Sequence, residues 1–301
     1  MEHDDTSVPM VRSFECTGPV DVSVDLDSGR LEIQLENSSA PGVAVQVRAD
    51  PASRPPWTTG IAGLLGWLGE QAGGAPPGEL AAEAVYRTMI DFTGSRLIVR
   101  SPRDLPLRTV PLTIQISAPS GSSITARSGS ADITIDGVAD RLDATTGSGQ
   151  FRAHECTGLT DIRTGSGDVR LGSVLGRLRV QTGSGEVEVT SVGASGGGAT
   201  VRTGSGDVRL GTVAHDMSAR TGSGDLTVAD ATAGGLELTT GSGQLRVGIH
   251  AGVRAELDVS SGCGQARSDL PVGGPPAEGD VGLRVRARTG SGDALVTAAP
   301  C

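Results

Sequence analysis

A six-residue phrase, Arg-Thr-Gly-Ser-Gly-Asp, recurs in this chain and constrains its fold more than any other feature. Identical copies begin at Arg163, Arg202, Arg220 and Arg288, and altered copies lie between and before them. A phrase that returns at a nearly constant interval indicates one supersecondary unit stacked on itself. We therefore expect a repeat protein, in which each unit buries apolar side chains against the next unit.

The spacing of the copies gives the size of the repeating unit. The Thr or Ser that opens one copy is most often followed by the next opener after 18 residues. Within one unit, Val169 and Leu171 alternate with polar residues, and a short turn leads to Leu178 and Val180, which alternate in the same way. This period of two is typical of strands with one buried face. Nine residues open the copies: Ser128, Thr146, Thr164, Thr182, Thr203, Thr221, Thr240, Ser261 and Thr289.

A unit of about 18 residues is too short for two parallel strands joined by a helix. No helical periodicity lies between the strands, which disfavours leucine-rich and Rossmann-type repeats. The remaining fold is all-β: a parallel β-helix, or β-solenoid, with about 18 residues per coil, in which successive coils pair as parallel strands. We predict this regular β-solenoid for residues 128–300.

The part of the chain before the repeats predicts less regular structure. Residues 11–50 and 91–127 alternate apolar and polar residues in short runs separated by turn residues, and we expect them to form β-strands of irregular first coils. Residues 1–10 are acidic and carry no apolar run, so we expect a disordered tail there.

An insertion, residues 51–90, interrupts this pattern. Prolines end the preceding strand, an apolar run follows, and residues 79–89 favour a helix. The insertion contains both tryptophans of the chain, and aromatic residues are enriched at interfaces. One interpretation is therefore a docking element for a partner. A membrane-interface contact through residues 57–68 is a weaker alternative, and the interpretation that we favour is a lid packed on the solenoid. The candidate docking residues are Trp57, Leu64, Leu65, Trp67 and Leu68.

The residue four positions after each opening Thr or Ser is often acidic. An aspartate at this position accompanies an arginine directly before the opening residue. Every copy with Arg directly before the opener has Asp at this position, and no other copy has Asp there. This correlation predicts that the two residues meet as a surface ion pair in each coil or between neighbouring coils, worth about 0–1 kcal/mol. The predicted pairs are Arg127 with Asp132, Arg163 with Asp168, Arg202 with Asp207, Arg220 with Asp225, and Arg288 with Asp293.

Composition and motifs exclude several function classes. The net charge of −10 disfavours nucleic-acid partners, which require a basic surface. The four cysteines are far apart and the four histidines form no catalytic or zinc spacing, so we expect free thiols, no cofactor, no metal and no enzyme activity. The start of the chain shows no secretory signal and no run long enough to span a membrane, so the expected location is the cytoplasm.

Three stretches resemble a known family. The repeats, the opening Phe-Glu-Cys-Thr-Gly-Pro-Val from Phe14, and the closing Val-Arg-Ala-Arg-Thr-Gly-Ser-Gly-Asp from Val285 are similar to a bacterial β-strand-repeat family of unknown function described as putative adhesins, particularly its actinobacterial members. The resemblance covers roughly residues 11–50 and 91–300, and it implies a β-helix without implying any site residue.

Two hypotheses of function follow from these features. The first is a non-enzymatic interaction or scaffold protein with an unknown partner, for which self-association through open strand edges is one candidate form. The alternative, which the resemblance implies, is an adhesin that binds glycans or proteins at the cell surface. The partner, the oligomeric state and the role of the insertion cannot be read from the sequence.

Overall fold

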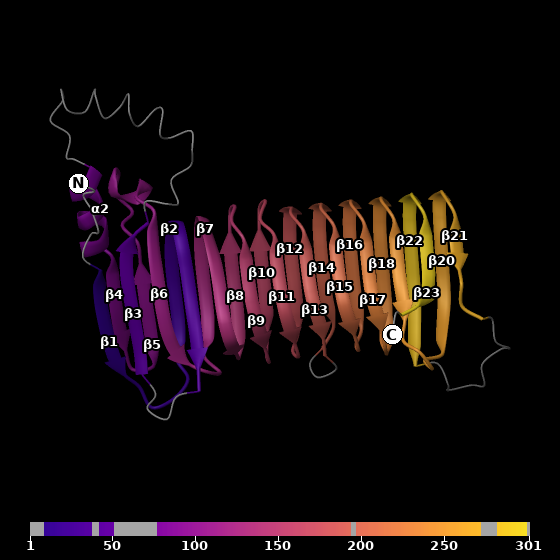
Figure 1. The fold of residues 1–301 in the computed structure, drawn as a ribbon, viewed down its shortest axis with the longest axis horizontal. Coiled ribbons are helices and arrows are strands. Elements are labelled where there is room, and N and C mark those ends of the chain that lie inside the picture. The colour runs from indigo at the N-terminus through magenta and orange to yellow at the C-terminus, as the bar shows by residue number, and fades with distance from the viewer. Residues whose placement is uncertain (1–8, 38–41, 51–76, 194–196, 272–281, 300–301) are drawn as a thin grey trace, which may run out of the picture. The chain divides into compact units, whose positions relative to one another are not determined.

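The computed structural model describes residues 9–37, 42–50, 77–193, 197–271 and 282–299, and strands dominate among them (Figure 1). The chain divides into two compact units. Unit 1 contains residues 1–138 and 144–149, and unit 2 contains residues 139–143 and 150–301. The predicted all-β solenoid is confirmed, and each unit is described separately below.

Unit 1 contains most of the strands that the sequence predicted to be irregular, together with helix α2 and the 3-10 helix η2. Strand β1 begins at Met10, within the predicted tail, of which residues 1–8 lie outside the described residues. Strand β8, Arg141–Thr146, contributes residues to both units. The other elements are β1 Met10–Glu15, β2 Asp21–Glu36, β3 Gly42–Ala49, α2 Pro77–Tyr86, β4 Met89–Thr93, β5 Arg96–Arg100, η2 Leu107–Thr109, β6 Leu112–Pro119 and β7 Ser123–Ala139.

Strand β2 bends around a corner and contributes to two faces of unit 1. Its first part, from Asp21 to Asp25, pairs in parallel with β5, and its second part, from Gly29 to Glu36, pairs in parallel with β6. Gly29 marks the corner, with φ of 117° and with the position of a Cβ atom only 2.0 Å from the carbonyl oxygen of Leu112. Only glycine fits there, because any side chain would overlap the backbone of β6.

Antiparallel strands close one end of unit 1. Strand β1 pairs antiparallel with β3, β3 pairs antiparallel with β6, and β4 pairs antiparallel with β5. Phe14 of β1 and Phe92 of β4 stack with ring centroids 5.0 Å apart. Both rings are half-buried, and their stacking joins β1 to β4 at this end of unit 1.

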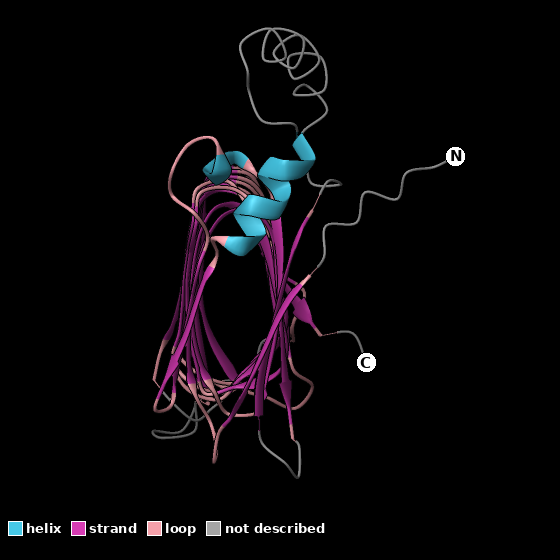
Figure 2. Cartoon of the chain, turned by 90° about the vertical axis from the view of Figure 1, so that its left-hand side faces the viewer, coloured by secondary structure: helices cyan, strands magenta, loops and turns pink. Residues whose placement is uncertain are grey.

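Helix α2 is the described part of the insertion. It spans Pro77–Tyr86, whereas the sequence predicted a helix over residues 79–89. The helix ends early because the chain turns into β4, and the hydroxyl of Thr88 donates to the carbonyl of Ala84 at 2.9 Å. Ala84 and Val85 are buried, and α2 contacts β3 and η2 at one end of the unit 1 strands (Figure 2). This position agrees with a lid, although residues 51–76 of the insertion lie outside the described residues.

Unit 2 consists of two facing layers of parallel strands. One layer contains β10 Thr160–Thr164, β12 Leu178–Ser184, β14 Ala199–Ser205, β16 Met217–Ser223, β18 Gly234–Ser242, β22 Leu283–Ser291 and β20 Ala255–Cys263. The other contains β9 Phe151–Cys156, β11 Val169–Val174, β13 Val187–Val192, β15 Val208–Val213, β17 Leu226–Ala231, β19 Leu245–Ile249, β23 Ala294–Ala298 and β21 Ala266–Ser268.

The register of unit 2 confirms the predicted coil size. Thr164 lies beside Thr182, Thr203 beside Thr221, and the inward-facing Val169 and Leu171 are buried. The coil from Thr182 to Thr203 is longer, and part of its extra length, residues 194–196, lies outside the described residues. Apolar side chains on alternate residues of both layers thus form one continuous narrow core.

The last two coils are not stacked in sequence order. Strand β22 pairs with β18 on one side and with β20 on the other, and β23 lies between β19 and β21. The prediction that successive coils pair is therefore wrong at this end, because the final coil inserts before the preceding one. Charge explains the order: the arginines of β22 lie beside the acids of β20, whereas sequential order would put Asp258 beside Glu237.

Candidate functional site

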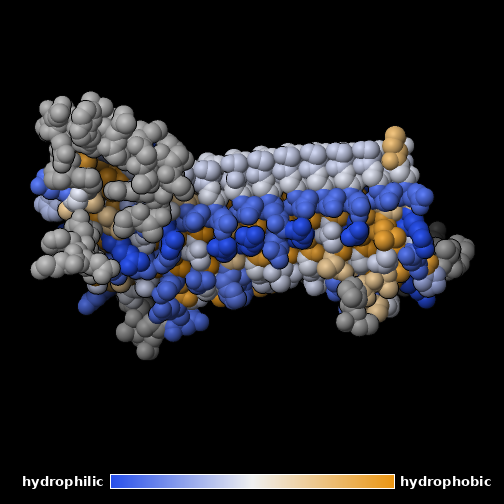
Figure 3. Space-filling model, turned by 45° about the horizontal axis from the view of Figure 1, so that its top comes forward, coloured by the Kyte–Doolittle hydropathy of each residue, from blue (hydrophilic) through white to orange (hydrophobic). Residues whose placement is uncertain are grey.

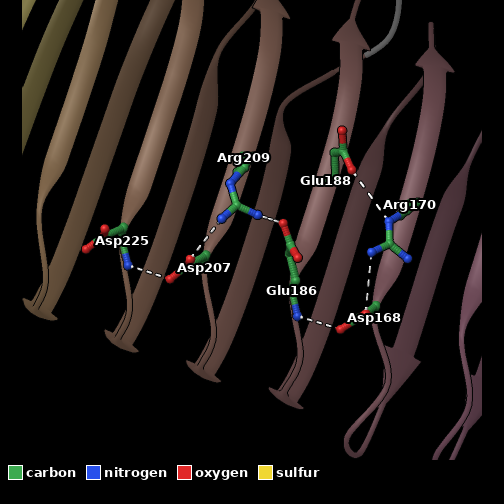
Figure 4. Close-up of polar contacts among 7 residues, drawn as sticks. All are labelled: Asp168, Arg170, Glu186, Glu188, Asp207, Arg209 and Asp225. Carbon is green, nitrogen blue, oxygen red and sulfur yellow. Dashed lines mark hydrogen bonds and ion pairs between the residues drawn. The ribbon is translucent and has the colours of Figure 1, made fainter.

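Aspartates at the start of one layer's strands form a ladder that joins neighbouring coils. The Oδ1 atom of Asp168 accepts the backbone N–H of Glu186 at 3.1 Å, and Asp207 accepts that of Asp225 at 2.9 Å (Figure 4). Asp225 accepts the N–H of Gln244 at 2.8 Å in the same way. Each aspartate therefore supplies an acceptor for a backbone donor in the next coil, just after the turn.

In Asp168 and Asp207 the second carboxylate oxygen meets an arginine two residues later in the sequence. Arg170 lies 3.6 Å from Asp168, and Arg209 lies 3.1 Å from Asp207 (Figure 4). Arg209 also pairs with Glu186 of the neighbouring coil. Residues i and i+2 of a strand share one face, so the Asp-Val-Arg spacing was a signal for this contact that sequence reasoning missed.

The predicted pairing between the arginine before the turn and the aspartate after it is wrong at four of the five turns. Arg163 pairs with Asp161 at 2.7 Å, Arg220 with Glu237 at 2.9 Å, and Arg288 with Asp258 at 3.3 Å. Among the described residues, no ion pair joins Arg163 with Asp168, Arg202 with Asp207, Arg220 with Asp225, or Arg288 with Asp293. The fifth pair, Arg127 with Asp132, stays a prediction.

The reason for this error is the geometry of the turn. Arg163 ends the β10 layer and Asp168 precedes β11 in the other layer, so the Thr-Gly-Ser-Gly segment between them carries the chain from one layer to the other. Asp168 and Asp293 both use Oδ1 for a backbone N–H in an adjacent coil, at 3.1 and 2.9 Å. Their carboxylates therefore point toward the neighbouring coil, and away from the layer that contains β10 and Arg163. The correlation in the sequence reflects copying of the repeat.

A double-mutant cycle tests this assignment. We expect Asp225→Ala to lower the free energy of unfolding by about 1 kcal/mol, because it removes an acceptor of a backbone N–H. Arg220→Ala should cost about 0.5 kcal/mol through its exposed pair with Glu237. The effects should add in the double variant when unfolding is followed in urea by circular dichroism. A coupling energy near 1 kcal/mol would instead support the original Arg220–Asp225 pair.

Buried threonines open the turns and bond across the coils. Thr221 donates to the carbonyl of Gly206 at 3.1 Å, and Thr240 donates to that of Gly224 at 2.9 Å. The hydroxyls of Thr182 and Thr203 are buried without a hydrogen-bond partner. The threonine column is thus part of the internal packing of the turns, and its members are not equally satisfied.

This difference predicts opposite effects of one isosteric substitution. Thr240→Val should lower the free energy of unfolding by about 1 kcal/mol, because it removes a made hydrogen bond. Thr203→Val should be neutral or stabilising by up to about 1 kcal/mol, because it removes a buried hydroxyl without a partner. Chemical denaturation of both variants provides the comparison, and equal losses would show that the two hydroxyls have equivalent partners.

The outer surface of the turns is a ridge of glycine and serine. Ser184, Ser205, Ser223 and Ser242 lie in register, and Ser291 continues the row to Cys263. In Figure 3 the ridge is the pale band beside a blue band of polar side chains. Glycines are required because a Cβ on Gly204 would lie 2.6 Å from the carbonyl oxygen of Gly183. The ridge therefore exposes a row of hydroxyl groups, and no large side chain projects from it.

The described surface of each unit carries a shallow hollow. The hollow in unit 1 has a volume of about 300 Å³, and Arg127 lines it together with Asp25 and Asp27. Asp25 lies 3.5 Å from Arg103, and Asp27 lies 2.5 Å from Arg108. These carboxylates are already neutralised by arginines, so they do not converge on a space for a substrate.

The hollow in unit 2 lies over a cluster of charges that sequence reasoning missed. Its volume is about 280 Å³, and Gly235 is one of the residues that line it. Arg284 lies 3.1 Å from Glu256, and Arg286 lies 3.2 Å from Asp258. The signal in the sequence was the alternation of charge in Leu-Arg-Val-Arg-Ala-Arg and in Ala-Glu-Leu-Asp, but the inserted coil was needed to bring the two stretches together.

The predicted docking residues lie outside the described part of the chain. These residues are Trp57, Leu64, Leu65, Trp67 and Leu68. Within the described residues, no helix is long and apolar enough to cross a membrane. Nor do the described residues contain a group of three or more His, Cys, Asp or Glu side chains arranged to hold a metal ion.

The described cysteines are free thiols in different environments. Cys156 is buried, with its sulfur 3.5 Å from the carbonyl oxygen of Asp140, and burial raises the pKa of its thiol above the ordinary value. Cys263 is exposed at the end of β20. Since the thiolate is the reactive form, Cys156 is expected to be inert in the folded protein.

Alkylation with iodoacetamide at neutral pH checks this expectation. Cys263 should be modified in the folded protein within minutes, and Cys156 only after unfolding in urea, with peptide mass spectrometry identifying the sites. Modification of Cys156 at the rate of Cys263 would contradict the burial that raises its pKa.

Comparison with solved structures gives matches over nearly the whole chain at low identity. A putative adhesin from Bacteroides fragilis is 10% identical, with a TM-score of 0.43, and the match covers 97% of this chain and 98% of that one. A putative lipid binding protein from Parabacteroides distasonis is 11% identical, with a TM-score of 0.42, and the match covers 96% of each chain. A comparison with curated proteins found no match.

The repeats themselves decide the family. The model of the Toastrack DUF4097 family matches residues 109–293, which is more than half of the chain and contains every copy of the six-residue phrase. The resemblance that the sequence predicted, to a repeat family of unknown function described as putative adhesins, is confirmed. The chain belongs to the Toastrack DUF4097 family.

Proposed function

We propose that this protein is a non-enzymatic interaction module, a scaffold that binds another protein at a strand edge or along the surface of its coils. The observation that carries the proposal is that the aspartates of the ladder bond to the backbone of the protein itself. The carboxylates of Asp168, Asp207 and Asp225 accept backbone N–H groups of neighbouring coils. They hold the coils together, whereas catalysis needs polar groups that converge on one reacting atom.

Unpaired strand edges supply the binding surface in this proposal. Within the described residues, β1 pairs only with β3, β4 only with β5, and β20 only with β22. A strand edge can accept an extended segment through main-chain hydrogen bonds. Self-association is one form of such binding, and an unrelated protein partner is the other.

Affinity capture tests the proposal. Full-length protein and a variant lacking residues 51–90 would be used as baits, with bound proteins identified by mass spectrometry and tested again as purified pairs. The proposal expects a purified partner, or a second copy, that binds directly to the full-length protein. Light scattering over a concentration series detects the second copy. A chain that stays monomeric and binds no purified candidate would overturn the proposal.

The proposed location is the cytoplasm. The exposed Cys263 and the half-buried Cys16 are free thiols, as is common in a reducing compartment. Fractionation of the native cells, with immunodetection of the protein, provides the measurement. Recovery in the soluble fraction is expected, and recovery at the cell surface would support the adhesin hypothesis instead.

A further inference from the structure

The spatial end of unit 2 is the coil formed by β20 and β21, and it has one open side. Within the described residues, β20 pairs only with β22, and β21 pairs only with β23. Leu257 and Val259 of β20 are half-buried, whereas Val285 of β22, which faces the same interior, is 1% exposed. The open edge therefore combines unpaired backbone with apolar side chains that a further strand would cover.

The outward row of this edge strand is acidic. Glu256 and Asp258 have side chains that are 63% and 54% exposed. Each contacts an arginine of β22 on its inner side, Glu256 meeting Arg284 at 3.1 Å and Asp258 meeting Arg286 at 3.2 Å. A strand added on the outer side would find the same two carboxylates at alternate positions.

The sign of the charge alternates from strand to strand toward this edge. Arg220 of β16 pairs with Glu237 of β18 at 2.9 Å. The next strand, β22, carries Arg286 beside Glu237, and the last strand, β20, carries Asp258 beside Arg286. Opposite charges on neighbouring strands stabilise a sheet, and like charges destabilise it. The strand that would follow β20 should therefore be basic.

We propose that the outer edge of β20 binds an extended segment of another protein that carries Arg or Lys at alternate positions, with small aliphatic residues between them. This deepens, and rests on, the proposed function as an interaction module. The basic side chains would lie beside Glu256 and Asp258, and the aliphatic side chains would cover Leu257 and Val259. Strand β22, with the sequence Leu-Arg-Val-Arg-Ala-Arg from Leu283, has the chemistry that fits this row.

Charge argues against a second copy of this chain as the occupant. Two β20 edges paired with each other would bring acidic rows together, which is destabilising. The edge strands of unit 1 are not basic on their outward rows either: β1 presents Glu15 on that row and β4 presents Asp91. A basic segment of a different protein is therefore the occupant that the edge favours.

A peptide that copies β22 tests the proposal on the full-length protein. The probe is a fluorescein-labelled peptide with the sequence of residues 282–291, Gly-Leu-Arg-Val-Arg-Ala-Arg-Thr-Gly-Ser, and its control has Glu in place of the three Arg. Fluorescence anisotropy should show saturable binding of the basic peptide and none of the acidic one. Binding should weaken about fivefold to tenfold in the E256Q/D258N variant, because two exposed charge pairs are lost.

A matched variant separates the edge from general attraction to an acidic protein. Glu237→Gln removes a negative charge from the same face, but on the interior strand β18, and it should leave peptide binding unchanged. Equal weakening by Glu237→Gln and by E256Q/D258N would overturn the proposal. Binding of the acidic peptide, or absence of any saturable binding, would overturn it as well.

Hydrogen exchange separates addition at the edge from displacement of β22. Bound peptide should slow amide exchange in residues 255–263 and leave residues 283–291 unchanged. Faster exchange in residues 283–291 would mean that the peptide replaces β22, which contradicts the proposed edge. If a captured partner binds the E256Q/D258N variant as well as the wild type, the edge proposal fails while the interaction function stands.

Discussion

Replacing Gly224 with alanine is expected to lower the free energy of unfolding by about 4 kcal/mol, the sum of close backbone overlap and strain. A Cβ at this position would lie 2.3 Å from the carbonyl oxygen of Gly206 and 2.6 Å from its carbonyl carbon. The backbone also has φ of 146°, which an L side chain rarely adopts. Neither atom can swing away, because both belong to the turn of the neighbouring coil.

The matched control for Gly224→Ala is Gly198→Ala in the same unit. The nearest atom to a Cβ on Gly198 is the carbonyl oxygen of Asp216, at the ordinary contact distance of 3.7 Å. This variant should be neutral or stabilising by about 0.5 kcal/mol, because alanine restricts the unfolded chain. Urea unfolding followed by far-ultraviolet circular dichroism gives both values. Similar stability of the two variants would show that the turns can separate without cost.

The coil size and the core could be predicted from the sequence because both are periodic. The interval of 18 residues sets which turns lie side by side, and the alternation at Val169 and Leu171 identifies the buried face. The N-terminal strands were also predicted, but their antiparallel pairing was not. That pairing depends on contacts such as the stack of Phe14 and Phe92, which are 78 residues apart and share no periodic signal.

The contacts of the ladder could not be predicted from correlation alone. Arg220 and Asp225 occur together in the phrase, yet Arg220 contacts Glu237 and Asp225 contacts the backbone of Gln244. Repetition shows that residues are copied together, but a four-residue turn decides whether they share a face. The i, i+2 rule for strands was the better guide, since it places Asp207 and Arg209 on one face.

The order of the last two coils could not be predicted from the periodicity of the sequence either. Coils 255–268 and 283–298 have similar apolar patterns, so either could follow β18 and β19. The inward-facing residues of β21 are Ala266 and Ser268, both exposed, and such residues suit the end of a stack better than its interior. Charge and polarity in particular residues thus decide an order that the repeat leaves open.

Replacing Phe151 with alanine is the second substitution with a large expected effect. Phe151 is the only aromatic residue of the repeats, it is fully buried, and it lies beside Val169 in the inward column of its layer. The change should lower the free energy of unfolding by about 3–5 kcal/mol, because a narrow core between two layers of backbone cannot collapse around the cavity.

Two further variants separate loss of volume at Phe151 from a general sensitivity of β9. Phe151→Leu keeps most of the volume and should cost about 1 kcal/mol, whereas Arg152→Ala, on the exposed face of the same strand, should change stability by less than about 0.5 kcal/mol. Circular dichroism is the suitable signal, since neither Trp57 nor Trp67 belongs to unit 2. A loss near 1 kcal/mol for Phe151→Ala would mean that the coils close around the cavity. The turns would then hold the two layers apart less rigidly than the close contact between the turns at Gly224 and Gly206 suggests.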